Sequence, residues 1–170
     1  HGFEELSHPL TSSEEGRFEL TRGASNFTLG SLRGNLLYRA RFEGPAPRVR
    51  AEHGQVFLEY NHSALRMLTL RKQSLQVDLN EQLAWQLVFR GGASKVVANM
   101  QALRLKGLEL RGGASQVTLH LPVPVGTVPV RITGGSSHLK LLRPKQMPMR
   151  VQVTGGVSHL SIDKLELGAV

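Results

Sequence analysis

The residues with the clearest chemical potential in this 170-residue chain are basic side chains concentrated in its second half. Residues 83–170 contain eleven Lys or Arg against three Asp or Glu and so supply the whole net charge of +8, whereas residues 1–82 contain ten of each sign. Such a surface attracts anionic partners. The candidate polyanion-binding residues are Lys95, Arg104, Lys106, Arg131, Lys140, Arg143, Lys145 and Arg150.

Groups that could catalyse a reaction lack suitable partners. Glycan cleavage needs clustered carboxylates, but the regular repeats of the second half offer only Glu109 and Asp163, and these two occupy different positions in their repeats. The serines of a repeated Gly-Gly-Ala-Ser phrase do not form a Gly-x-Ser-x-Gly nucleophile motif. We therefore predict no catalytic residues and no small-molecule substrate, and a glycan-active enzyme is the least favoured hypothesis.

The sequence also provides no convincing metal or cofactor site. His138 and His159 occupy the same position in consecutive repeats, which would stack them about 5 Å apart on neighbouring strands. Lys95 and Gln116 continue that row, and neither completes a zinc shell. The chain has no cysteine, which excludes disulfides and thiolate ligands. We expect no cofactor, and the histidine row could instead respond to mild acid.

These side chains are positioned by a repeat. A glycine pair followed by a small residue and serine begins at Gly91, Gly112, Gly134 and Gly155, at spacings of 21, 22 and 21 residues. Alternating apolar residues precede and follow each phrase, as in Leu87 and Phe89 before the first. A fixed period that contains two-residue alternation is typical of a stacked array of β-strands.

The period predicts an all-β fold, a single-stranded parallel β-solenoid (β-helix) of about seven rungs with 21–22 residues per regular rung. Short strands rising about 3.3 Å per residue fit this length, and successive rungs would stack about 4.8 Å apart. The glycine pairs would form corners, where positive φ or close backbone approach favours glycine. Hairpin-based sandwiches or propellers are less favoured, because the chain has no Asn-Gly or Asp-Gly dipeptide.

The same phrase occurs once near the N-terminus, at Gly23. Aligning it with the phrase at Gly92 places Phe27 over Val96 and Phe18 over Leu87. We expect residues 1–16 to be a polar tail or N-terminal cap, residues 17–163 to be one solenoid domain, and residues 164–170 to be a C-terminal strand or cap. Within the domain, rungs 17–82 are irregular and rungs 83–163 are regular. Uncovered ends would offer unpaired strands to another protein or to another copy of the chain.

The run from Leu79 to Ser94, followed by Leu103–Leu110 and the next Gly-Gly-Ala-Ser, resembles the bacterial toast-rack domains. These belong with adhesin-like domains of unknown function and with the cell-wall-active-antibiotics response proteins. The resemblance covers residues 79–163. It implies a bacterial β-solenoid module, often part of a membrane-anchored protein at the cell envelope, with no known catalytic residues. No segment of the chain approaches 18 consecutive apolar residues.

We therefore expect a non-catalytic structural or protein-interaction module of the bacterial cell envelope, whose biochemical role the sequence leaves open. The alternative is a polyanion-binding module that uses the basic C-terminal rungs to bind acidic wall polymer, an anionic membrane surface or nucleic acid. Nucleic acid is the least favoured of these, because neither interleaved exposed aromatic residues nor a recognition helix is predicted.

Overall fold

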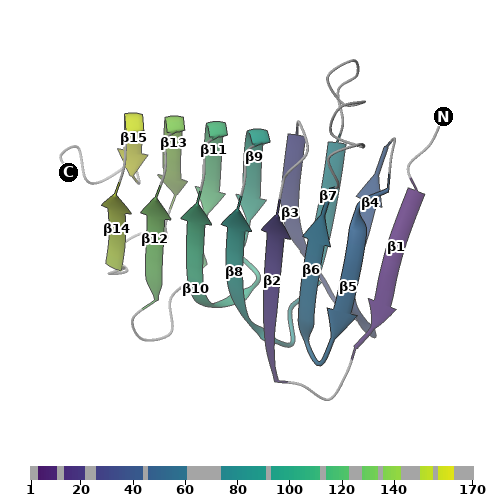
Figure 1. Cartoon of the computed structure of the whole chain (residues 1–170). Coiled ribbons are helices and arrows are strands. Elements are labelled where there is room, and N and C mark those ends of the chain that lie inside the picture. The colour runs from purple at the N-terminus through teal and green to yellow at the C-terminus, as the bar shows by residue number, and fades with distance from the viewer. Residues whose placement is uncertain are drawn as a thin grey trace.

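The computed structural model describes residues 4–10, 14–21, 26–43, 46–60, 74–90, 93–111, 114–122, 128–133, 136–142, 150–154 and 157–162. Their regular structure is entirely β-strand and forms two sheets that face each other (Figure 1). Sheet A contains, in spatial order, β1 (Glu4–Pro9), β4 (Leu36–Phe42), β7 (Ser74–Asn80), β3 (Asn26–Leu32), β9 (Ala93–Asn99), β11 (Ala114–His120), β13 (Ser136–Leu142) and β15 (Val157–Ile162). Sheet B contains β14 (Arg150–Thr154), β12 (Pro129–Thr133), β10 (Arg104–Arg111), β8 (Ala84–Arg90), β2 (Glu15–Thr21), β6 (Gln55–Glu59) and β5 (Arg48–Glu52). The predicted all-β class is confirmed.

From β8 onward the chain forms regular coils, each of which contributes one strand to sheet B and the next to sheet A. Strands of neighbouring coils are parallel, and residues at equivalent positions of the repeat are in register: Val96 pairs with Val117, and Val117 pairs with Leu139. The same holds in sheet B, where Leu87 pairs with Leu108. Inward aliphatic side chains of successive coils therefore stack directly on one another, because the repeat length preserves their phase.

The N-terminal half departs from the prediction of an exclusively parallel solenoid, because both sheets are mixed. The strands β1 and β4, β4 and β7, and β5 and β6 pair antiparallel. A two-residue hairpin joins β5 to β6 through His53 and Gly54, whose φ angles of 51° and 79° fit a type I′ turn. A histidine in the first turn position hides the usual dipeptide signal, so the sequence did not reveal this reversal.

The coils are also not stacked in chain order. The coil β2–β3 lies between β6–β7 on one side and β8–β9 on the other. Phe27 of β3 thus pairs with Leu75 of β7 and with Val96 of β9. Six coils of this kind are present among the described residues, and β1, β4 and β5, here called the antiparallel end, lie beyond β6–β7.

The short connection from β3 to β4 passes over the end of β7, because β7 lies between these two strands. Asn80, whose side chain is fully buried at the end of β7, forms hydrogen bonds with backbone groups at this connection. Its Nδ2 donates to the carbonyl oxygens of Gly34 at 3.0 Å and Leu36 at 2.7 Å, and its Oδ1 accepts from the backbone N–H of Gln82 at 2.8 Å. One side chain thus supplies hydrogen-bond partners that these backbone groups would otherwise lack.

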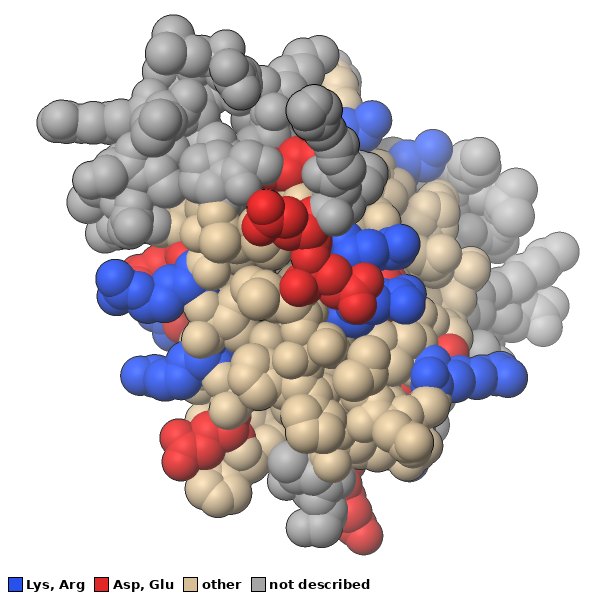
Figure 2. All heavy atoms as spheres, turned by 90° about the vertical axis from the view of Figure 1, so that its right-hand side faces the viewer, with Lys and Arg blue, Asp and Glu red and all other residues tan. Residues whose placement is uncertain are grey.

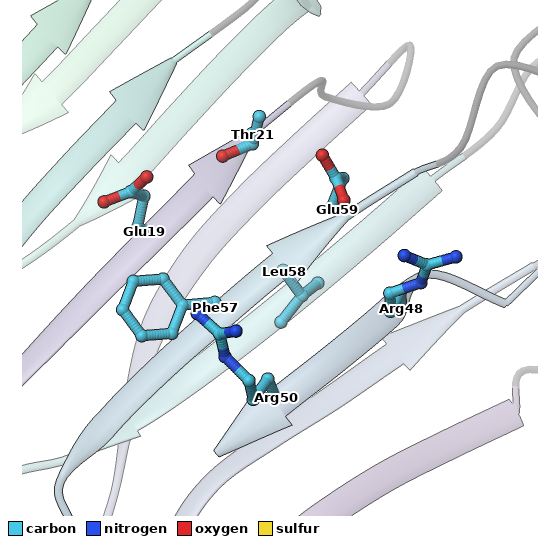
Figure 3. Close-up of a pocket in the computed structure, with 7 residues that line it drawn as sticks. All are labelled: Glu19, Thr21, Arg48, Arg50, Phe57, Leu58 and Glu59. Atoms are coloured by element: carbon cyan, nitrogen blue, oxygen red, sulfur yellow. The ribbon is translucent and has the colours of Figure 1, made fainter. Parts of the chain in front are cut away.

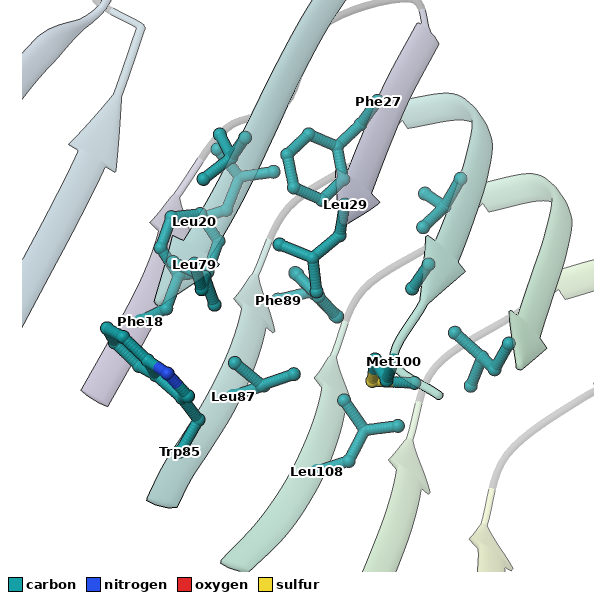
Figure 4. Close-up of a cluster of buried hydrophobic side chains, with 14 of the residues drawn as sticks. Phe18, Leu20, Phe27, Leu29, Leu79, Trp85, Leu87, Phe89, Met100 and Leu108 are labelled. Atoms are coloured by element: carbon teal, nitrogen blue, oxygen red, sulfur yellow. The ribbon is translucent and has the colours of Figure 1, made fainter. Parts of the chain in front are cut away.

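The core between the sheets is aliphatic along the regular coils and aromatic where β2–β3 meets β8 (Figure 4). The ring of Phe27 lies 6.2 Å from that of Phe18 and 5.5 Å from that of Phe89, measured between centroids. Beside them, the buried Trp85 donates its Nε1–H to the carbonyl oxygen of Asn80 at 2.8 Å. Gly16 of β2 lies against this indole ring, and a Cβ there would be 2.6 Å from its Cζ3 atom.

Several predicted features fall outside the described residues: the glycine pairs of the four regular phrases, Gly23 of the N-terminal phrase, the irregular stretch 61–73, and the tail 163–170. The corner role of the glycines therefore stays a prediction. In the part of the chain that is described, no helix is long and apolar enough to cross a membrane.

Candidate functional site

The structure distributes the predicted polyanion-binding residues over two opposite faces. Lys95 on β9 and Lys140 on β13 are exposed on the outer face of sheet A. Arg104, Lys106 and Arg131 are exposed on β10 and β12 of sheet B. The backbone of Arg150 lies on β14 of sheet B, its side chain is not described, and Arg143 and Lys145 lie outside the described residues. The set does not form one patch.

Some of these cations are engaged within the chain. The Nζ of Lys106 lies 2.8 Å from Oε1 of Glu15, and Arg104 donates to the backbone carbonyl of Gln82. Lys95, Arg131 and Lys140 form no ion pair with a described residue. Among the described candidates, only Lys106 has its charge offset by a carboxylate of the chain.

A different site, which the sequence did not suggest, lies beside the antiparallel end on sheet B. It is a groove of about 300 Å³ formed by β2, β6 and β5 (Figure 3). Its lining residues are Glu19, Thr21, Arg48, Arg50, Phe57, Leu58 and Glu59. Three adjacent strands bring these side chains together, although they are separated by up to 40 positions in the chain.

The groove holds two exposed arginines that form no ion pair within the described residues. The guanidinium of Arg50 lies over the ring of Phe57, with its Cζ atom 4.8 Å from the ring centroid, a cation–π contact that orients the side chain. Arg48 stands opposite Glu59 in the strand register, without an ion pair between them. Arginine presents a planar set of donors that suits a carboxylate or phosphate. This wall of the groove can therefore bind an anionic group.

On the other side of the groove, Glu19 is already neutralised. Its carboxylate oxygens lie 3.1 Å from Nη2 of Arg17 and 3.1 Å from Nε of Arg90. Glu59 is the other carboxylate that lines the groove, and it forms no ion pair with a described residue. The groove therefore carries its unpaired positive charge along β5, at the edge of the sheet.

Two carboxylates elsewhere in the described part of the chain, Asp78 and Glu109, are also paired with arginines. Asp78, whose side chain is 6% exposed, lies 3.1 Å from Nη2 of Arg39 and 3.6 Å from Nη2 of Arg41. Glu109 lies 2.6 Å from Nη2 of Arg111. Asp78 thus links β7 to its neighbour β4, whereas Glu109 pairs with an arginine of its own strand β10. Asp163, the other carboxylate considered for glycan cleavage, lies outside the described residues.

The histidine row predicted from the repeat is in register along sheet A. Gln116 pairs with Lys95, His138 pairs with Gln116, and His159 pairs with His138. Among the described residues, no cluster of three or more His, Asp or Glu side chains is placed to hold a metal ion. The proposed response of this row to acid stays a prediction.

The chain is thus an all-β repeat domain: two facing sheets are built from stacked coils, and antiparallel strands lie at one end of the stack. The sequence matches the N-terminal domain of toast_rack, DUF2154, over residues 5–142. The chain belongs to this family, as the motifs at residues 79–94 and 103–110 predicted. The match also extends through the irregular N-terminal half, which those motifs do not cover.

The fold is similar to that of a solved structure named as a "putative cell adhesion protein" from Clostridium sporogenes ATCC 15579. The TM-score is 0.66 at 15% sequence identity, over 94% of this chain and 97% of that one. A "putative adhesin" from Bacteroides fragilis NCTC 9343 aligns over 94% of this chain and 97% of that chain at 10% identity, with a TM-score of 0.32. A comparison with curated protein sequences found no match. The similarity to the Clostridium sporogenes structure is one of fold alone.

Proposed function

We propose that this domain is a non-catalytic protein-interaction module of the bacterial cell envelope, and that the antiparallel end is its binding face. Membership of the toast_rack family and the fold shared with a "putative cell adhesion protein" support the general role. The observation that carries the binding face is the groove beside β5, where Arg48 and Arg50 are exposed and form no ion pair with a described residue.

The shape of this end favours a macromolecular partner. Figure 2 looks onto it and presents a broad uncharged area with acidic and basic side chains on and around it. The partly buried apolar residues Leu6, Val49 and Ala51 pack against the core from β1 and β5. Apolar groups surrounded by charged ones are typical of interaction surfaces, in which a dry centre is enclosed by a polar rim.

Site-specific photo-crosslinking in the bacterial host tests this function. A benzoylphenylalanine residue in place of Phe57 in the groove should give a covalent adduct that mass spectrometry identifies as an envelope protein. The same residue in place of Lys140, exposed on the far face of sheet A, is the matched control and should give at least fivefold less adduct. Equal adducts at both positions, or adducts with cytoplasmic proteins alone, would contradict the proposal.

Polyanion binding is the second candidate, because Lys95, Arg131 and Lys140 are exposed without ion pairs in the described part of the chain. Their division between opposite faces means that a polymer would contact one face at a time. Retention on immobilised heparin should then fall by a similar amount in Arg131→Glu and in Lys140→Glu, and should decrease steeply with salt. Retention unchanged by either substitution would exclude these residues as the binding site.

A further inference from the structure

The strand β5 is the last strand of sheet B, and within the described residues it pairs only with β6. In a two-residue hairpin the pair next to the turn, here Glu52 with Gln55, is hydrogen bonded, and the pattern then alternates. Arg50 and Arg48 therefore direct their backbone groups toward β6. Val49 and Ala51 direct their N–H and C=O groups toward the open edge, where a further strand can bind them.

The side chains of β5 alternate in character between the two faces of the sheet. Arg48 and Arg50 are exposed on the outer face, whereas Val49 and Ala51 are partly buried against the core. Residues two apart on a strand are separated by about 6.6 Å, both on β5 and on any strand added to it. A bound strand would therefore meet the two arginines on one face and an incompletely covered apolar edge on the other.

We infer that β5 binds an extended segment of a partner protein in which acidic residues alternate with apolar ones. This inference rests on the proposed interaction function and specifies the partner chemistry. The backbone of the segment would pair with Val49 and Ala51, its acidic side chains would lie beside Arg48 and Arg50, and its apolar side chains would extend the core. Main-chain pairing supplies affinity and the alternating side chains supply selectivity.

The other edge at this end suits such a segment less well. The outermost strand of sheet A is β1, whose exposed residues include Glu4 and Glu5. These carboxylates would repel an acidic segment. The charge difference between the two edges therefore directs an acidic strand to β5 rather than to β1.

The test uses a fluorescein-labelled peptide, Ser-Glu-Val-Glu-Val-Glu-Ser with blocked ends, and measures its Kd by fluorescence anisotropy. The double substitution Arg48→Glu with Arg50→Glu should raise the Kd at least about tenfold, since attraction at two sites becomes repulsion. The control Lys95→Glu with Lys140→Glu makes the same change in net charge on the far face and should alter the Kd less than twofold. A peptide with Lys in place of Glu should bind at least tenfold more weakly.

The backbone contribution is tested by Ala51→Pro. Proline is tolerated at an edge where the N–H faces solvent, so the pairing of β5 with β6 is retained while one donor to an added strand is lost. We expect about tenfold weaker peptide binding with an unchanged circular dichroism spectrum.

Should the charge-reversed protein fail to fold, Arg48→Gln with Arg50→Gln replaces it in the charge test, with an expected loss of peptide affinity of at least threefold.

Three results would overturn the inference. Equal binding by wild type and Ala51→Pro would mean that charge alone holds the peptide, as for an anionic polymer. A wild-type dimer in sedimentation that dissociates in Ala51→Pro, without peptide binding, would assign the edge to a second copy. No peptide binding at all, with the adduct at position 57 still formed, would refute the acidic strand and leave the interaction function standing.

Discussion

Substitution of Gly16 by alanine provides a direct test of the contact between the first coil and β8. Gly16 on β2 pairs with Trp85 on β8, and a Cβ on Gly16 would lie 2.6 Å from Cζ3, 2.7 Å from Cε3 and 2.8 Å from Cη2 of the indole. The ring cannot easily move away, because it is fully buried and its Nε1–H is bound to the carbonyl of Asn80.

The expected cost of Gly16→Ala follows from two opposing terms. Overpacking of a filled core costs about 1–3 kcal/mol. Loss of glycine entropy in the unfolded chain offsets about 0.4–1 kcal/mol of this. The net decrease in unfolding free energy should be roughly 1–2 kcal/mol, which lowers the Tm of a chain of this size by about 2–8 °C. Urea unfolding followed by circular dichroism measures the free energy directly.

Gly107→Ala is the matched control. Its Cβ would lie 2.6 Å from Oε1 of Gln86, the end of a flexible side chain that can rotate away, so we expect a change within about 0.5 kcal/mol. Combining Gly16→Ala with Trp85→Phe, which removes the opposing ring atoms, should recover about 1 kcal/mol of the loss. Equal costs for Gly16→Ala in both backgrounds, or equal costs at both glycines, would refute the packing of β2 against β8.

Two further predictions concern buried polar groups. Asn80→Ala removes three hydrogen bonds between a fully buried side chain and the backbone and should lower the unfolding free energy by about 2–3 kcal/mol in urea titrations, whereas a loss under 0.5 kcal/mol would contradict its role beneath the β3–β4 connection. Burial raises the pKa of Tyr38 and of Tyr60, the two tyrosines of the chain, from 10.0 to about 12. Between these pH values the folded protein retains phenol protons that the unfolded chain releases. The contribution of the two tyrosines to the unfolding free energy is therefore complete below pH 10 and is lost as the pH rises through about 12. Absorbance at 295 nm should show phenolate forming near pH 12 in native protein and near pH 10 in urea, and a native midpoint near 10 would refute the burial.

The phase of each coil could be predicted from the sequence, because strand alternation and a fixed repeat length together determine which residues lie over one another. The row from Val96 to Val117 and Leu139 is in register as expected. The alignment of the N-terminal phrase also made Phe18 equivalent to Leu87 and Phe27 equivalent to Val96. In the structure these equivalent residues are direct partners in the strand register, which the alignment alone did not predict.

The order of the coils could not be predicted. Similar aliphatic alternation occurs in every coil, so it does not specify which coil lies next to which. Leu75 stands 21 positions before Val96, one repeat length, but Phe27 of the first coil lies between them. The groove could not be predicted for the same reason, since Glu19 comes opposite Phe57, and Thr21 opposite Glu59, only when β2 lies beside β6. One local signal could have predicted the β5–β6 hairpin: the alternation Arg48-Val49-Arg50 followed shortly by His53-Gly54.

The position of β2–β3 inside the stack has a consequence for how the chain folds as it is synthesised. Phe18 must wait for Val56, 38 residues later, and for Leu87, 69 residues later, before its two parallel neighbours exist. The first coil therefore cannot seed a stack that grows steadily from the N-terminus, and closing these loops makes the initial step slow. Once β8–β9 has docked, each later coil needs only the next 21 or so residues. Deleting residues 15–32 would accordingly not shorten the stack at one end but divide it in the middle.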